Sequence, residues 1–271
     1  MHLHCIKDLR VVDETYMTVK FIQVNAYMGK YLDELVDFLK SEDPDFISMQ
    51  EVTTNDFNLC SNKDISLFEY FSDKLKMHGE FNGDLKLAGH PDSVFGNAVF
   101  SRFPVIHRKV VVLKSFRPLT LAELSGDSGE FREQIDRHLL DAQISINGKL
   151  MHVLCWHGAW TAPPHDTDET SRQADIVYDY MRTINEPFIL GGDLNAIIGS
   201  KTVNLMSTIA NNVMLNSKVS MTTNPKVHKI APRGYLIDFI FTSQDIRLID
   251  LTVPEITVSD HLPVIAWLEI G

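Results

Sequence analysis

The sequence predicts an α/β fold in which two mixed β-sheets pack on each other with helices outside. Short runs of branched apolar residues alternate with segments of helical spacing, as in α/β proteins. One pair of runs is joined by Asn147-Gly148, the dipeptide most typical of an antiparallel hairpin. Because a doubly wound parallel sheet has no such hairpin, mixed sheets fit the pattern better.

The N-terminal half is expected to start with a strand, a helix and a second strand. The helix should cover residues 30–40, because Leu32, Leu35 and Leu39 recur every three or four positions. Residues 1–17 form either an edge strand or a tail. The strands expected in this half cover residues 18–24, 45–50, 96–102 and 109–116.

The C-terminal half contains the hairpin and further alternating elements. The hairpin strands should cover residues 139–146 and 149–157, and helices are expected at 170–182 and 202–212. Two segments, 115–130 and 159–169, are expected to be loops over a functional site. The remaining strands are expected at residues 187–190, 235–242, 246–253 and 263–270.

Length and composition predict one domain covering residues 1–271, since the chain has no repeat and no linker-like segment. The three cysteines, Cys5, Cys60 and Cys155, have no disulfide spacing and are expected to be free thiols. No apolar run is long enough to insert into a membrane, and no secretory signal is visible at the N-terminus. We therefore expect a cytoplasmic protein.

The balance of acidic and basic residues indicates whether nucleic acid is a suitable partner. The formal net charge is −11, with 36 acidic and 25 basic residues, whereas proteins that grip duplex phosphates through Lys and Arg usually carry the opposite balance. This argues against tight nonspecific DNA binding. It does not exclude a nuclease, because an acidic protein can carry a local basic groove.

Five polar side chains share one position in the predicted fold: Asn25, Glu51, His157, Asp193 and Asn195 each lie at the C-terminal end of an expected strand. Ligand sites of α/β folds gather at such strand ends. Each residue taken alone has a simpler explanation, such as a solvated carboxylate or an Asx turn.

Asp238 lies inside the apolar run 236–241, where an unpaired carboxylate would cost several kcal/mol. His261 is the natural partner, because a carboxylate raises the pKa of an imidazole and fixes its tautomer. Asp260 lies beside it, in the loop before the last expected strand. Hard oxygen donors of this kind favour Mg²⁺ or Mn²⁺ over Zn²⁺. Arg102 and Arg172 are candidates for a phosphate clamp, and surface charge is the simpler explanation of both.

The motifs around these residues resemble those of the endonuclease/exonuclease/phosphatase superfamily, which includes DNase I-like nucleases, neutral sphingomyelinases and inositol polyphosphate phosphatases. The resemblance covers nearly the whole chain and implies a four-layer α/β/β/α sandwich of the DNase I-like type. The motifs are Val24-Asn25, Met49-Gln50-Glu51, Gly96-Asn97-Ala98-Val99-Phe100-Ser101-Arg102-Phe103-Pro104, Cys155-Trp156-His157, Gly192-Asp193-Leu194-Asn195, Ile237-Asp238-Phe239-Ile240-Phe241 and Ser259-Asp260-His261-Leu262-Pro263.

The resemblance also implies a metal site. Glu51 would be the main ligand of a divalent cation, assisted by Asn25 and Asp260. Such a cation helps water to attack phosphorus in line by neutralising developing negative charge.

Catalytic roles follow from the same resemblance. Asp193 would orient or deprotonate the attacking water, and Asn195 would hold that water or the phosphate. Asp238 and His261 would form a dyad beside the scissile phosphate, and His157 would donate a hydrogen bond to a nonbridging oxygen.

The substrate stays open at this level. The leading hypothesis is a nuclease acting on DNA or RNA. The alternative is a hydrolase of a smaller phosphoester, such as a phospholipid headgroup or an inositol phosphate. An inactive family member that only binds is disfavoured, because every expected position is filled. No protein partner can be inferred.

Overall fold

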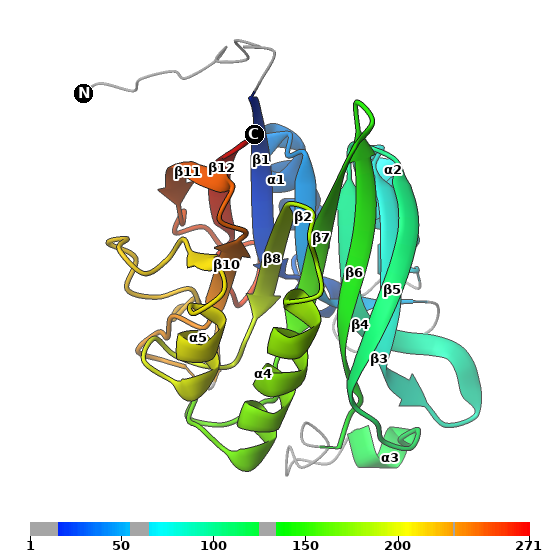
Figure 1. The fold of residues 1–271 in the computed structure, drawn as a ribbon. Coiled ribbons are helices and arrows are strands. Elements are labelled where there is room, and N and C mark those ends of the chain that lie inside the picture. Colours follow the sequence, from blue (N-terminus) through cyan, green and yellow to red (C-terminus); the bar gives the residue numbers. More distant parts are fainter. Residues whose placement is uncertain (1–15, 55–64, 125–133, 230) are drawn as a thin grey trace.

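The computed structural model describes residues 16–54, 65–124, 134–229 and 231–271. Two six-stranded sheets pack face to face, with helices on the outer faces (Figure 1). The predicted fold class is therefore confirmed. No helix within the described part of the chain is long and apolar enough to cross a bilayer.

The first sheet contains both ends of the described chain. Its β1 and β2 strands run parallel, and the other neighbours run antiparallel. In spatial order the strands are β11 (Ile246–Thr252), β12 (Val264–Ile270), β1 (Met17–Asn25), β2 (Phe46–Thr53), β4 (His90–Ser101) and β3 (His78–Leu87).

The second sheet has the same mixed character, with one parallel pair, β7 and β8, among antiparallel neighbours. The predicted hairpin is confirmed, since Ile146 pairs with Lys149 across the Asn147-Gly148 turn. In spatial order the strands are β5 (Val105–Lys114), β6 (Arg137–Ile146), β7 (Lys149–His157), β8 (Phe188–Asp193), β10 (Asp238–Thr242) and β9 (Asn211–Asn212).

The helices form the two outer layers. The alternation of side chains along β1 shows how: Phe21 packs in the core shared with the second sheet, whereas Ile22 packs in the cluster beneath the helices of the first. The first sheet is covered by α1 (Leu32–Glu42) and α2 (Leu67–Leu75), and the second by α4 (Asp168–Met181) and α5 (Lys201–Met206). Two short helices, η1 (Tyr27–Gly29) and α3 (Leu121–Leu124), lie in connections.

The two sheets lie in close contact where Gly191 of β8 faces the first sheet. A Cβ at this position would lie 2.7 Å from Ser48 Cβ and 2.8 Å from Phe21 Cζ. The Ser48 hydroxyl donates to the Gly191 carbonyl at 2.9 Å. The glycine therefore lets β2 and β8 lie near each other, and with them the side chains at their C-terminal ends.

Two predicted elements are shorter in the structure. The helix expected at 202–212 ends at Met206, because residues 211–212 pair with β10 as a short strand. The strand expected at 235–242 begins at Asp238, because the Tyr235 carbonyl accepts the N–H groups of Thr222 and Thr223 instead of joining the sheet.

The structure describes only part of the N-terminal segment and of the loops that the sequence predicted. Strand β1 begins at Met17, and the rest of the N-terminal segment, residues 1–15, lies outside the described residues. The loop expected at 115–130 contains α3, and its residues 125–130 also lie outside them. Cys155 is a buried free thiol as expected, whereas Cys5 and Cys60 fall in undescribed segments.

Candidate active site

Strand order and register bring the predicted site residues to one edge of the sandwich. The parallel pairs β1–β2 and β7–β8 end side by side, with Asn25 paired to Gln50 and His157 paired to Asp193. Strand β10 runs antiparallel to β8 and starts at this same edge, where Asp238 pairs with Asp193. Strand ends from both sheets thus meet in one place.

Glu51 is turned toward this edge by a bulge in β2. The register with β4 shifts between Met49 and Val52, and Glu51 adopts a left-handed φ of 56°. Such a conformation is costly for a side-chain-bearing residue and is found mainly where the surrounding structure imposes it. The bulge re-aims a half-buried carboxylate that an ideal strand would direct elsewhere.

The segment carrying Asp260 and His261 is tied to the end of β1. The Ser259 hydroxyl donates to the Asn25 carbonyl at 2.6 Å and accepts the N–H of His261 at 3.1 Å. The Asp260 carbonyl accepts the N–H of Asn224 at 2.7 Å. These bonds hold the loop on both sides, so that its two functional side chains face the strand ends.

Asp238 and His261 form the predicted dyad. His261 Nδ1 lies 2.8 Å from Asp238 Oδ2, and Asp238 is fully buried. The Thr222 hydroxyl accepts the N–H of Asp238 at 3.0 Å and so helps to position it. Burial acts to lower the pKa of His261, but the charges of Asp238 and Asp193 outweigh it and raise that pKa well above its usual value.

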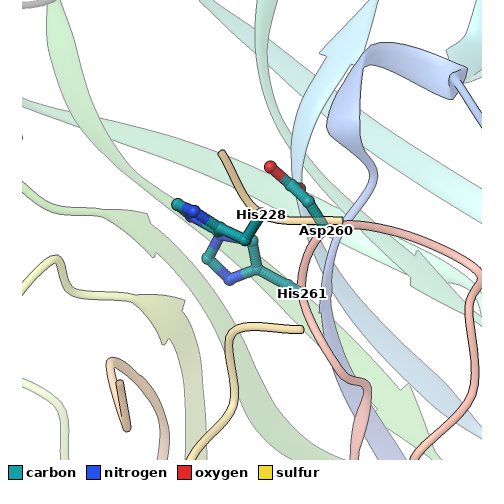
Figure 2. A group of neighbouring side chains, drawn as sticks. All are labelled: His228, Asp260 and His261. Atoms are coloured by element: carbon teal, nitrogen blue, oxygen red, sulfur yellow. The ribbon is translucent and has the colours of Figure 1, made fainter. Parts of the chain in front are cut away.

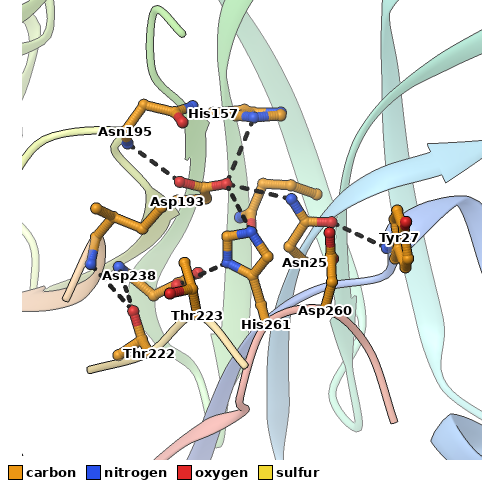
Figure 3. Close-up of polar contacts among 12 residues, drawn as sticks. Asn25, Tyr27, His157, Asp193, Asn195, Thr222, Thr223, Asp238, Asp260 and His261 are labelled. Carbon is orange, nitrogen blue, oxygen red and sulfur yellow. Dashed lines mark hydrogen bonds and ion pairs between the residues drawn. The ribbon is translucent and has the colours of Figure 1, made fainter. Parts of the chain in front are cut away.

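Asp193 lies at the centre of the cluster (Figure 3). Its Oδ2 atom accepts a hydrogen bond from Asn25 Nδ2 at 3.2 Å and lies 3.6 Å from both His157 Nε2 and His261 Nε2. Its Oδ1 atom accepts the N–H of Asn195 at 3.1 Å. Burial and the charge of Asp238 raise the pKa of Asp193 to about 6, against the opposing effect of His261.

His157 stands on the opposite side of Asp193 from the dyad. Burial, followed by the positive charges of Arg137 and His261, holds the pKa of His157 well below its usual value. Its Nδ1 atom is buried and makes no hydrogen bond within the described structure. His157 is therefore a neutral imidazole, suited to donate one hydrogen bond to an anionic ligand.

Glu51, Asn25 and Asp260 supply oxygen donors of the kind that a hard divalent cation prefers. Burial raises the pKa of Glu51, and burial together with the charge of Glu51 raises the pKa of Asp260 to about 6. The negative charges of these carboxylates repel one another, and a bound cation would neutralise that repulsion. The donor set therefore fits Mg²⁺ or Mn²⁺.

Comparison with known proteins agrees with this geometry. The sequence model of the Endonuclease/Exonuclease/phosphatase family matches residues 22–261. The chain belongs to the endonuclease/exonuclease/phosphatase family. No curated protein sequence matches the chain.

Solved structures of the family share the fold of the chain at low sequence identity. A member from Bacteroides vulgatus is 18% identical, with 94% of this chain and 100% of that chain covered and a TM-score of 0.70. A mannosyl-6-phosphatase from Bacteroides thetaiotaomicron is 15% identical, with 92% and 99% covered and a TM-score of 0.66. The human nocturnin catalytic domain with bound sulfate is 16% identical, with 93% of each chain covered and a TM-score of 0.65.

In this family member, sequence reasoning missed His228. Figure 2 shows its ring beside Asp260 and His261, and suitable ligand atoms of the three residues lie within 4.8 Å of one another. The N–H of Ala231 donates to His228 Nδ1 at 3.0 Å. In the neutral imidazole the hydrogen then resides on Nε2, which makes that atom a donor rather than a metal ligand. A histidine in a segment without periodicity offered no sequence signal.

Arg137 was also missed, although a signal existed. Arg137 begins β6, two residues before Leu139, which pairs with Trp156 near the end of β7. Its charge acts on His157, the last residue of β7. Arg137 is only 3% exposed. Burial lowers its pKa, against the charges of Asp84, Asp193 and Glu51.

The structure does not bring Arg102 and Arg172 into the cluster. Arg102 donates to Asp45 and Asp43 at 2.9 and 2.6 Å, at the end of β2 that lies away from Glu51. Arg172 on α4 donates to both carboxylate oxygens of Glu169, at 3.0 and 2.8 Å. Nearby carboxylates therefore already bind both guanidinium groups, as the simpler explanation held.

A cavity of about 530 Å³ opens beside Asn195. The predicted loop 159–169 forms one wall and the segment containing His228 forms the other. Its volume lies within the usual range for small-molecule sites. The lining residues are Trp160, Thr161, Ala162, Pro163, Pro164, Asn195, Thr223, His228, Ala231, Pro232, Arg233, Tyr235 and Ile237.

Proposed function

We propose that the chain is a divalent-metal-dependent phosphoester hydrolase. The observation that carries the proposal is the convergence of carboxylate, amide and imidazole groups from both sheets around Asp193, within the distances given above. Neither sheet supplies the complete set alone. Membership of the endonuclease/exonuclease/phosphatase family supports phosphoester hydrolysis as the class of reaction.

Glu51, Asn25 and Asp260 would hold the cation, Mg²⁺ or Mn²⁺. When bound, it supplies positive charge that stabilises the negative charge developing on the phosphate oxygens. Asn25 is well placed for this role because the N–H of Tyr27 and the Asp193 carboxylate fix its amide from two sides.

Asp193 would orient the attacking water and accept its proton. A carboxyl whose pKa is about 6 is a stronger base than an ordinary aspartate and is poised for proton transfer near neutral pH. The Asn195 amide donates to the Gly158 carbonyl at 3.3 Å, which keeps it at the mouth of the cavity. There it would hold the water or a phosphate oxygen.

The two histidines would stabilise the transition state from opposite sides. The Asp238 carboxylate keeps His261 positively charged, and this imidazolium would interact with the phosphate oxygens. His157, as a neutral donor, would bind a nonbridging oxygen. His228, which lines the adjacent cavity, would supply a third donor through Nε2, for the leaving group.

The cavity beside Asn195 favours a compact phosphoester as substrate. Its wall is largely apolar and aromatic, with Arg233 as its charged side chain among the described residues. The net charge of −11 also disfavours a long polyanion. Nuclease activity is the second candidate, because Trp160 and Tyr235 offer aromatic surfaces on which a base could stack.

A substrate panel tests the proposal. Bis(4-nitrophenyl) phosphate, 4-nitrophenyl phosphate, inositol phosphates, plasmid DNA, single-stranded DNA and RNA are each incubated with Mg²⁺, Mn²⁺ or EDTA. We expect turnover of small phosphoesters with either metal and none with EDTA. Faster turnover of nucleic acid would select the second candidate. A panel without any metal-dependent turnover would overturn both.

A further inference from the structure

Strand β1 carries a buried amide that the proposed mechanism does not yet use. Gln23 has no exposed surface, and it alternates along the strand with Phe21 and Asn25 on the face that meets the second sheet. A buried amide costs free energy unless its donors and its acceptor are satisfied. The partners of Gln23 should therefore explain why a polar side chain occupies this position in the core.

The first partner is a second fully buried amide, Gln50 on β2. The two side chains pair reciprocally, because Gln23 Nε2 donates to Gln50 Oε1 and Gln50 Nε2 donates to Gln23 Oε1 at 3.1 Å. Gln50 Nε2 also donates to the Ser48 hydroxyl at 3.2 Å, and that hydroxyl donates to the Gly191 carbonyl at 2.9 Å. The pair is thereby anchored to β8 of the second sheet.

The second partner of Gln23 is the carboxylate of the dyad. Gln23 Nε2 donates to Asp238 Oδ1 at 3.4 Å, whereas His261 Nδ1 lies 2.8 Å from the other oxygen, Oδ2. Asp238 belongs to β10 of the second sheet and Gln23 to β1 of the first. The amide therefore reaches the dyad across the interface between the sheets.

Only one orientation of the Gln23 amide satisfies all of these contacts. With its nitrogen and oxygen exchanged, Oε1 would face Asp238 Oδ1, and two acceptors would meet without a hydrogen between them. The orientation of Gln50 is fixed in the same way, because Ser48 gives its own hydrogen to Gly191 and can only accept from the amide. The network therefore presents a donor to Asp238.

A donor on Oδ1 restricts how the carboxylate can turn. The terminal torsion of an aspartate has a broad energy minimum, so that one bond on Oδ2 leaves the plane of the group poorly determined. We propose that Gln23, oriented by Gln50, is a positioning residue that holds the Asp238 carboxylate in the plane that His261 requires. The inference rests on the role proposed for the dyad, and Gln23 acts in it through Asp238 and not on the substrate.

Proton NMR of the metal-free protein, labelled isotopically at histidine nitrogens, tests this geometry without turnover. The Nδ1 hydrogen of His261 should give a downfield resonance, identified by its absence in Asp238→Asn. Gln23→Met removes the donor at similar volume, and we expect it to shift this resonance upfield or to lose it by exchange with water. Gln143→Met, which replaces a half-buried amide beside His152, should leave the resonance unchanged.

An unchanged resonance in folded Gln23→Met would overturn the inference. Because that substitution leaves Gln50 without its partner, a second variant combines Gln23→Met with Gln50→Met. Replacing both members of a buried hydrogen-bonded pair by apolar side chains of similar shape can be nearly neutral for stability. The double variant should therefore fold and show the same change, and an unchanged resonance in it would equally refute the role of the pair.

A double-mutant cycle on kcat separates positioning from a general structural effect. With bis(4-nitrophenyl) phosphate and Mg²⁺, Gln23→Met should lower kcat by about 10- to 100-fold, the equivalent of one hydrogen bond to a charged group, with little change in KM. In the Asp238→Asn background, the same substitution should change kcat by less than about twofold. An equal loss in both backgrounds would show that Gln23 does not act through Asp238.

The two measurements distinguish failure of this inference from failure of the proposed function. The resonance of His261 depends on the geometry of the dyad and requires no hydrolysis. A protein without phosphoesterase activity can therefore still show the expected change in Gln23→Met. Conversely, an active enzyme whose resonance is the same in wild type and Gln23→Met would retain the proposed function and lose the inference.

Discussion

Asp238 shows how one buried carboxylate can determine the chemistry of its neighbour. It has no exposed surface, so its negative charge is stabilised by the protein alone, through His261 on Oδ2 and through Gln23, whose Nε2 donates to Oδ1 at 3.4 Å. The same charge keeps His261 protonated in an interior that would otherwise neutralise it. The pair therefore maintains a positive charge beside Asp193 without any exposed cation.

Asp238→Asn tests this role. The amide cannot hold the imidazolium, so kcat should fall by about 10²- to 10⁴-fold, while KM changes little because Asp238 does not touch the substrate. Steady-state kinetics on the best substrate measures both, and circular dichroism checks the fold. Asp245→Asn, which neutralises an exposed carboxylate, serves as the control. A kcat within twofold of wild type would remove the dyad from the mechanism.

At this scale, the sequence predicted the residues that stand next to strand ends or inside apolar runs. Asp193 and Asp238 were recognisable because a polar residue next to a strand end or inside an apolar run indicates a binding or catalytic role. His228 was not, because its position depends on how an irregular segment folds back over Asp260. Arg137 was overlooked in favour of Arg102, although only the hairpin register, and not composition, distinguishes the two.

Elements with strong periodicity were predicted well. The helix expected at 30–40 appears at Leu32–Glu42, and the Asn147-Gly148 turn set the register of the β6–β7 hairpin. Helix α2 and strand β3 were not anticipated, since β3 contains Gly79 and Gly83 and its exposed, half-buried and buried side chains do not alternate. The bulge at Glu51 also escaped sequence reasoning, because it arises from pairing with β4.

Strands β6 and β7 carry a pH-sensitive contact beneath α4, away from the active site. His152 Nδ1 lies 2.8 Å from Asp141 Oδ2, which also accepts a hydrogen bond from the Tyr180 hydroxyl at 2.6 Å. Burial acts to lower the pKa of His152, but Asp141 and Glu186 outweigh it and raise the pKa above its usual 6.5. A raised histidine pKa stabilises the folded state fully below pH 6.5 and progressively less as pH rises through the folded pKa.

Urea unfolding of His152→Gln across pH should show this dependence. The free energy of unfolding that the substitution removes should be largest near pH 6 and smaller by on the order of 1 kcal/mol near pH 9. His107→Gln, which replaces an exposed histidine on β5, should show no such trend. A loss for His152→Gln that is independent of pH would show that the contact contributes packing alone.

At the scale of the whole molecule, an acidic protein places two buried cations, Arg137 and His261, beside the carboxylates of the proposed site. The net charge is −11, yet His261 and a divalent cation would both face the phosphate. The packing of two mixed sheets makes this possible, because Asn25 and Glu51 come from one sheet and His157 and Asp193 from the other. Long-range electrostatics would repel polyanions while the cleft attracts a compact one.

The most direct test of the central claim is the initial rate of bis(4-nitrophenyl) phosphate hydrolysis by wild-type protein and Asp193→Ala, each with Mg²⁺ and with EDTA. The account predicts Mg²⁺-dependent turnover in the wild type and a rate lower by about 10³-fold or more in Asp193→Ala, with an unchanged circular dichroism spectrum. Equal rates in the two proteins, or turnover that persists in EDTA, would contradict it.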